Sequence, residues 1–262
     1  MDIREIRIIS GADKDGNPEG VEEIKIISGD ILVIAGPTGS GKSQLLSDLE
    51  QLADGDSPSG RRVLVNGKTI DPFSTRITAR LSQNMHFVMD LDVGNFIELH
   101  ADSRGITGNG VVEKVISLSN ELAGEPINTG IHLSSLSGGQ SRALMIADAA
   151  VISNAPVVLI DEIENAGIDK TKGIKLLSTE GKMVLIATHD PTIMLTAPRR
   201  VIMKNGSISK IIRTSQVEKE NLNNLVKIDT FLGGLRQKLR HGEELNENSF
   251  ILPKTLYEND EL

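Results

Sequence analysis

The 262-residue sequence predicts an α/β fold: a mixed, mainly parallel sheet, an antiparallel β region at the N-terminus and an inserted helical subdomain. The first observation is a set of short apolar runs without polar alternation, at residues 31–35, 157–160 and 183–187. Such runs are typical of strands that are buried on both faces. The second observation is that residues at helical spacing separate these runs. Strands that alternate with helices are typical of a parallel sheet.

The N-terminal β region rests on two similar segments, at residues 4–11 and 22–29. Both carry several isoleucines, and the polar, turn-rich residues 11–20 separate them. We interpret them as two paired strands and not as a repeat architecture. The buried strand at residues 31–35 follows, and after it come a glycine-rich turn and a helix that begins near Lys42.

Two Asn-Gly pairs predict hairpins, because this dipeptide favours the tight turn between antiparallel strands. Asn66-Gly67 lies between the apolar residues 63–65 and Thr69-Ile70, and Asn205-Gly206 lies between the apolar residues 201–203 and Ile208. We expect the second hairpin to close the core domain.

The core domain is therefore expected at residues 1–213, with a mostly helical subdomain inserted at about residues 85–156. The remaining residues, 214–262, form an acidic tail, for which the composition favours a helix followed by disorder. Apolar residues recur in this tail at helical spacing: Ile228, Phe231, Leu232, Leu235 and Leu239. Gly233-Gly234 interrupts them, at a cost of about 1 kcal/mol per glycine.

The composition of the chain argues against several classes of function. The chain has no cysteine, so disulfides, thiolate metal sites and a cysteine nucleophile are excluded. A net charge of −8, no basic run and only 2% aromatic residues argue against a nucleic-acid partner. No apolar run approaches the ~20 residues of a membrane-spanning helix, and the first residues lack the features of a secretory signal. We expect a cytoplasmic protein, which a membrane partner would hold at the inner face of the membrane.

A glycine-rich motif lies between the strand at residues 31–35 and the next helix. It consists of Gly36, Pro37, Thr38, Gly39, Ser40, Gly41, Lys42 and Ser43. Glycines let consecutive N–H groups turn toward an anion, and the helix start adds a positive end. We expect Lys42 to reach the β- and γ-phosphates of ATP, and the Ser43 hydroxyl to coordinate Mg²⁺.

Two carboxylates, Asp161 and Glu162, end the strand at residues 157–160. A carboxylate at the carboxyl end of a strand lies beside the phosphate loop in open α/β sheets. Asp161 is a candidate Mg²⁺ ligand. Glu162 is a candidate general base that orients and deprotonates the attacking water.

A second glycine-rich segment opens another helix: Leu136, Ser137, Gly138, Gly139 and Gln140. By the same helix-dipole and N–H argument it is a second anion site. A chain with two such sites either binds two phosphate groups or shares one ligand between subunits.

This set of motifs resembles the ABC (ATP-binding cassette) ATPase family over roughly residues 3–212. The resemblance implies a P-loop NTPase core with a RecA-like sheet, and hydrolysis of ATP with Mg²⁺. It also implies that Gln83 is the glutamine that senses Mg²⁺ and the attacking water, and that His189 hydrogen-bonds the γ-phosphate. Asp169 matches the aspartate of the family's dimer-crossing loop.

The resemblance further implies a head-to-tail dimer in which Ser137 and Gly139 of one subunit contact the γ-phosphate held by the other subunit's Lys42. A homodimer is the simpler arrangement, because one chain carries every part of a complete site.

Two features depart from the family pattern. The segment from Glu162 to Asp169 is one residue longer than usual and lacks a proline after Glu162. The chain also has no aromatic residue before Phe73 to stack on adenine. If Ile9 or Val21 covers the ring instead, about 1–3 kcal/mol of stacking is lost. We expect weaker affinity and poorer discrimination between ATP and GTP.

Three partners are compatible with such an ATPase. The leading interpretation is a subunit that powers a separate membrane permease, with Phe87, Met89 and Phe96 either docking a permease helix or packing within the insertion. The alternative is a soluble ABC ATPase that acts on a cytosolic protein, as the iron–sulfur assembly ATPases of the family do. A role in DNA repair is disfavoured, because the chain has no room for a long coiled coil or zinc module.

Overall fold

The computed structural model describes residues 2–72, 76–82, 87–106, 108, 110–162 and 167–250, except the side chains of residues 247 and 248. The chain forms two compact units, Met1–Arg213 and Thr214–Leu262, and each is described by itself.

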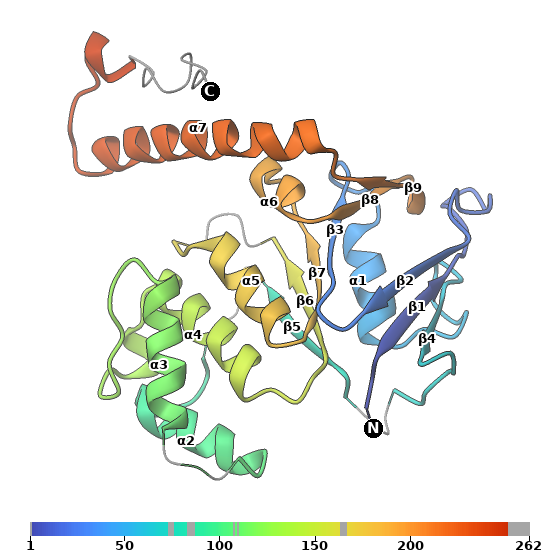
Figure 1. Ribbon diagram of the computed structural model, residues 1–262, viewed down its shortest axis with the longest axis horizontal. Coiled ribbons are helices and arrows are strands. Elements are labelled where there is room, and N and C mark those ends of the chain that lie inside the picture. The colour runs from blue at the N-terminus through green and yellow to red at the C-terminus, as the bar shows by residue number, and fades with distance from the viewer. Residues whose placement is uncertain are drawn as a thin grey trace. The chain divides into compact units, whose positions relative to one another are not determined.

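A six-stranded sheet forms the centre of the first unit (Figure 1). Its strands are β3 (Ile31–Ala35), β5 (Thr78–Ser82), β6 (Val157–Asp161), β7 (Met183–Ala187), β8 (Arg199–Lys204) and β9 (Ser207–Arg213). They follow the order β5-β6-β7-β3-β8-β9, and every neighbouring pair is parallel except β8 and β9. The predicted mixed, mainly parallel sheet is confirmed, and so is the hairpin at Asn205-Gly206.

A separate three-stranded antiparallel sheet contains β1 (Glu5–Ile9), β2 (Glu23–Ile27) and β4 (Arg62–Val65), in the order β2-β1-β4. The pairing of the two isoleucine-rich segments is therefore confirmed. The alternation of buried and more exposed residues along β1 and β2 shows why they pair: each strand presents one apolar face to the core.

At Asn66-Gly67 the predicted turn is correct, but the predicted hairpin is wrong. Both residues have positive φ, and Val65 forms an antiparallel bridge with Lys68, but the described residues 69–72 that follow form no strand. Ile70 packs against the core instead. Pro72 comes soon after and has no N–H to donate, so a longer ladder has no support here.

Helices cover both faces of the parallel sheet, as Figure 1 shows. They are α1 (Lys42–Glu50), α2 (Val93–Ser103), α3 (Val111–Leu122), α4 (Gly138–Val151), α5 (Lys170–Thr179) and α6 (Pro191–Thr196), with a 3-10 turn, η1, at Leu133–Ser135. Alternate residues of β6 pack into two different parts of the hydrophobic core, one on each face of the sheet. Leu159 packs with α1 and the antiparallel sheet, whereas Ile160 packs with α4 and α5.

The second unit contains α7 (Gln216–Arg240) and a 3-10 turn, η2 (Glu247–Phe250). Ser215 and Glu218 form a capping box at the start of α7. The helix continues through Gly233-Gly234, so the small cost of two glycines does not interrupt a helix of 25 residues. Disorder was expected for the last twenty residues, 243–262. Of these, residues 247–250 form η2, and residues 251–262 lie outside the described residues. Among the helices that the structure describes, none combines the length and apolar character of a membrane span.

Candidate nucleotide site

The phosphate loop connects β3 to α1 and requires glycine at two positions. Gly36 has a φ of 157° and Gly41 a φ of 103°. A Cβ on Gly36 would lie 2.6 Å from the carbonyl oxygen of Met203, and one on Gly41 would lie 2.8 Å from the Cα of Gly206. The β8–β9 hairpin thus presses on the loop, and the Gly206 N–H donates to the carbonyl oxygen of Ser40 at 2.8 Å. This close approach leaves no room for a side chain at Gly36 or Gly41.

Lys42 is buried inside this loop. Its side chain is 7% exposed, and its Nζ donates to the carbonyl oxygens of Gly36 (2.8 Å) and Pro37 (3.1 Å). No carboxylate of the described residues forms an ion pair with it. A buried ammonium whose partners are neutral carbonyls retains its attraction for an anion. The loop is therefore suited to a phosphate group.

A cavity of about 270 Å³ lies in front of the loop. It is lined by Lys14, Thr38, Gly39, Gly41, Lys42, Ser43, Gln44, Glu162 and His189. The structure therefore brings the predicted cradle together with the predicted base and the predicted histidine. Lys14 was not expected here. It comes from the turn-rich segment between β1 and β2, and its Nζ donates to the carbonyl oxygen of Gly39 at 3.0 Å.

Glu162 and His189 meet because β6 and β7 are adjacent, parallel strands that end at the same edge. The Nε2 atom of His189 lies 3.8 Å from Oε1 of Glu162. Glu162 has a φ of 53°, and its N–H donates to the carbonyl oxygen of Ala187 at 3.0 Å. A left-handed backbone costs a residue with a side chain about 1–3 kcal/mol, and such strain is found most often at functional sites.

His189 is held by the helix start that follows it. Asp190 caps α6 by accepting from the Thr192 N–H at 2.8 Å, and it pairs with Lys170 Nζ at 2.7 Å. Burial alone would raise the pKa of the Asp190 carboxyl, but the bonds from Lys170 and Thr192 outweigh burial and lower that pKa. The capped turn fixes the backbone next to His189.

Asp161 lies at the end of β6, in a smaller hollow beside Glu162. Its Oδ2 accepts a hydrogen bond from Nη2 of Arg80 at 2.8 Å. Carboxylate and hydroxyl oxygens suit Mg²⁺, which usually takes one or two carboxylates together with phosphate and water oxygens. Asp161 and Ser43 fit that donor set, and the described residues contain no cluster of three or more acidic or histidine ligands that would serve another metal. Gln83 lies outside the described residues.

The second glycine-rich segment lies elsewhere on the surface. Ser137 is the N-cap of α4: the Gln140 N–H donates to Ser137 Oγ at 3.2 Å, and the Ser137 N–H donates to Gln140 Oε1 at 2.9 Å. Ser137 and Gly138 are exposed, Gly139 is half-buried, and none of the segment lines the cavity at Lys42. The two predicted anion sites of one subunit therefore do not share a ligand within that subunit.

Asp169 caps α5 in the structure. Its carboxylate accepts from the Lys172 N–H at 3.0 Å and pairs with the Lys172 ammonium at 3.2 Å. The longer segment that precedes it falls on residues 163–166, which lie outside the described residues. The carboxylate of Asp169 is thus engaged by its own helix.

A groove of about 470 Å³ runs along the free edge of β5 beside the helical subdomain. Phe87, Met89 and Phe96 contribute to it. Phe87 and Phe96 pack edge to face with ring centroids 4.9 Å apart, while Met89 is 41% exposed. The two phenylalanines thus pack within the insertion and also line the groove.

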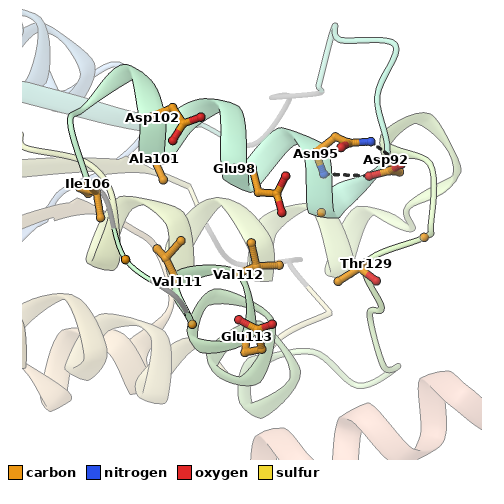
Figure 2. Close-up of a pocket in the computed structure, with 14 residues that line it drawn as sticks. Asp92, Asn95, Glu98, Ala101, Asp102, Ile106, Val111, Val112, Glu113 and Thr129 are labelled. Atoms are coloured by element: carbon orange, nitrogen blue, oxygen red, sulfur yellow. Dashed lines mark hydrogen bonds between the residues drawn. The ribbon is translucent and has the colours of Figure 1, made fainter.

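A larger hollow of about 780 Å³ lies between α2 and α3 (Figure 2), and none of the residues that line the cavity at Lys42 lines it. Asp92, Glu98, Asp102 and Glu113 lie around it, and the Asp92 carboxylate accepts bonds from the main-chain and side-chain N–H groups of Asn95. Four carboxylates repel phosphate, so this hollow is not a second nucleotide site.

Comparison with known proteins identifies the family of the chain. The family model described as ABC transporter matches residues 22–165, more than half of the chain. An uncharacterized ABC transporter ATP-binding protein of Methanocaldococcus jannaschii is 52% identical over 96% of this chain and 98% of its own length. A macrolide export ATP-binding/permease protein of Paracoccus denitrificans is 29% identical over 73% of this chain, which spans only 30% of that protein.

Solved structures share the fold. The cbiO1 protein of Clostridium perfringens, part of the ABC transporter complex cbiONQ, superposes with a TM-score of 0.61 at 22% identity, over 91% of this chain and 100% of that one. An ATP-binding subunit of an ABC transporter gives a TM-score of 0.61 at 17% identity, over 82% and 92%. The matched family model, the full-length relative and the fold lead to one conclusion: the chain belongs to the ATP-binding cassette (ABC) family, as a nucleotide-binding subunit.

Proposed function

We propose that this chain binds ATP with Mg²⁺ and hydrolyses it between two head-to-tail copies. The observation that carries the proposal is the position of the second anion site: Ser137 and Gly139 open α4 on the surface, outside the cavity of their own subunit. An exposed helix start can bind a phosphate that a neighbouring subunit brings to it. That phosphate is the one bound in the neighbour's cavity at Lys42.

Within the cavity, Lys42 binds the β- and γ-phosphates, and the loop N–H groups surround them. Ser43, in the cavity, and Asp161, in the smaller hollow beside Glu162, would hold the Mg²⁺, which when bound neutralises charge on the phosphate oxygens. Glu162 orients a water molecule and accepts its proton. His189, 3.8 Å from Glu162, donates a hydrogen bond to the γ-phosphate.

The partner subunit contributes the second half of the site. The partner's Ser137 hydroxyl and the partner's Gly139 N–H donate to the γ-phosphate, as preorganised donors that stabilise charge in the transition state. ATP binding then closes the dimer, and hydrolysis opens it because the shared phosphate is lost. Gln83 keeps its expected role as the sensor of Mg²⁺ and the attacking water.

The dimer powers a separate membrane permease, from the cytoplasmic side of the membrane. This is supported by the full-length relative, which is described as an ABC transporter ATP-binding protein, and by the groove at Phe87 and Met89. A groove with an exposed methionine and half-buried phenylalanines is suited to an amphipathic helix. No relative named above is described as an iron–sulfur assembly protein.

Glu162→Gln tests the catalytic part of the proposal. The amide cannot accept the proton of water but retains the shape of the side chain, so ATP stays bound and the closed dimer accumulates. Light scattering with ATP and Mg²⁺ should show a dimer, and phosphate release should be nearly absent. Hydrolysis at the parent rate would show that Glu162 is not the general base.

A further inference from the structure

Arg80 connects the metal ligand Asp161 to the far end of the phosphate-loop helix. Its Nη2 donates to Oδ2 of Asp161 and its Nη1 donates to Oε2 of Glu50, both at 2.8 Å. The arginine side chain is 28% exposed, Asp161 18% and Glu50 39%. One guanidinium therefore joins two carboxylates from different elements.

The register of the sheet explains this geometry. β5 and β6 are parallel, and Ser82 lies opposite Asp161. Arg80 is two residues before Ser82, so it projects from the same face of the sheet. That face carries α1, which ends at Glu50 and begins at Lys42. A long arginine side chain can follow the strand direction and reach both carboxylates.

The charge balance of Asp161 depends on this arginine. An arginine guanidinium keeps its positive charge in proteins, and here it occupies one of the two oxygens that Asp161 offers to a metal ion. A cation that binds Asp161 meets a positive charge already in contact with it.

We propose that Arg80 is a positioning residue that holds Asp161 while no metal is bound and competes with Mg²⁺ for its carboxylate. This inference rests on the proposed role of Asp161 as a Mg²⁺ ligand. The arginine then sets the Mg²⁺ concentration at which nucleotide binds tightly. When Mg²⁺ displaces the Arg80 side chain, that side chain can turn into the groove along β5, which it also lines and which is open to solvent.

Arg80→Gln tests the competition through binding and not through turnover. A fluorescent, non-hydrolysable ATP analogue is titrated onto the protein at a series of free Mg²⁺ concentrations. The Mg²⁺ concentration that gives half of the gain in nucleotide affinity should fall about five-fold, the factor expected for losing one partly exposed ion pair. Arg80→Lys keeps the charge but cannot reach both carboxylates, so its midpoint should fall less.

Arg62→Gln is the matched control, because Arg62 is exposed on β4 and its loss removes the same charge. Its Mg²⁺ midpoint should equal that of the parent. A midpoint that stays unchanged or rises in both Arg80 variants overturns the competition, even if their melting temperatures fall.

Asp161→Asn separates this inference from the proposed function. If Asp161 is a metal ligand, the asparagine variant needs far more Mg²⁺ to gain nucleotide affinity. If its Mg²⁺ dependence equals that of the parent, the metal assignment itself is wrong. A strong effect of Asp161→Asn without any effect of Arg80→Gln overturns only the role of Arg80.

Discussion

Replacing Arg61 by methionine is expected to destabilise the core domain strongly, because it leaves two carboxylates buried without a cation. The Nη2 atom of Arg61 lies 2.5 Å from Oε1 of Glu19, and its Nη1 lies 2.9 Å from Oδ2 of Asp48. All three side chains are fully buried. Arg61 also donates to the carbonyl oxygen of Gly206 at 2.7 Å, in the hairpin that presses on the phosphate loop.

Breaking a buried pair by removing one partner costs about 3–5 kcal/mol. For a domain of this size, each kcal/mol lowers the melting temperature by about 2–4 °C, so a fall of about 6–20 °C is expected. Differential scanning calorimetry measures that fall. Because Arg61 supports the turn at Gly206, nucleotide affinity should decrease as well.

A triple variant shows whether buried charge is the cause. Arg61→Met combined with Glu19→Gln and Asp48→Asn removes the uncompensated carboxylates and should recover much of the lost stability. Arg7→Met, in an ion pair at the surface, is the control and should change the melting temperature little. A loss for Arg61→Met no larger than that for Arg7→Met would refute the reasoning.

The site itself yields three further predictions. Gly41→Ala places a Cβ 2.8 Å from Gly206 Cα at a positive φ, so nucleotide affinity measured by titration should fall roughly tenfold; unchanged affinity would contradict the close approach. Lys42→Ala removes the buried cation and should abolish measurable ATP binding with the fold retained in circular dichroism; unaltered affinity would undo the assignment of the cradle. Asp190→Asn keeps the helix cap but loses the ion pair with Lys170. Because the folded pKa of Asp190 lies below its ordinary 3.8, its contribution is present at neutral pH and is lost as the pH falls through that lowered value. Urea midpoints of parent and variant should therefore differ at pH 7 and approach each other as the pH falls below 3.8, and a constant difference would argue against the ion pair.

Much of the fold follows from local patterns, whereas the assembly of the site depends on strand order. The sequence indicates that Glu162 and His189 each follow a buried strand, but it does not indicate that β6 and β7 are neighbours. Their 3.8 Å approach is a consequence of that adjacency. The Asn-Gly dipeptide predicted the turn at Asn66-Gly67 correctly, but a hairpin also needs a second strand.

The residues that the sequence did not reveal are single basic side chains without a motif. Lys14, Arg61 and Arg80 have no spacing that distinguishes them from solvated surface residues. Arg61 meets acidic partners that lie 42 and 13 positions away in the chain. Such contacts are tertiary, so only the packed structure shows that Lys14 lies at the phosphate cavity and Arg80 at the metal ligand.

The central claim is that each ATP is held by the phosphate loop of one subunit and the glycine-rich helix start of the other. The chain has no cysteine, so two introduced thiols give an unambiguous cross-link. Thr38 and Ser137 are both exposed, one at each half of the proposed site. With Glu162→Gln present to retain ATP, a mixture of Thr38→Cys and Ser137→Cys chains should form a disulfide-linked dimer only with ATP and Mg²⁺, and neither variant alone should do so. A folded mixture that binds ATP but gives no cross-linked dimer would contradict the account.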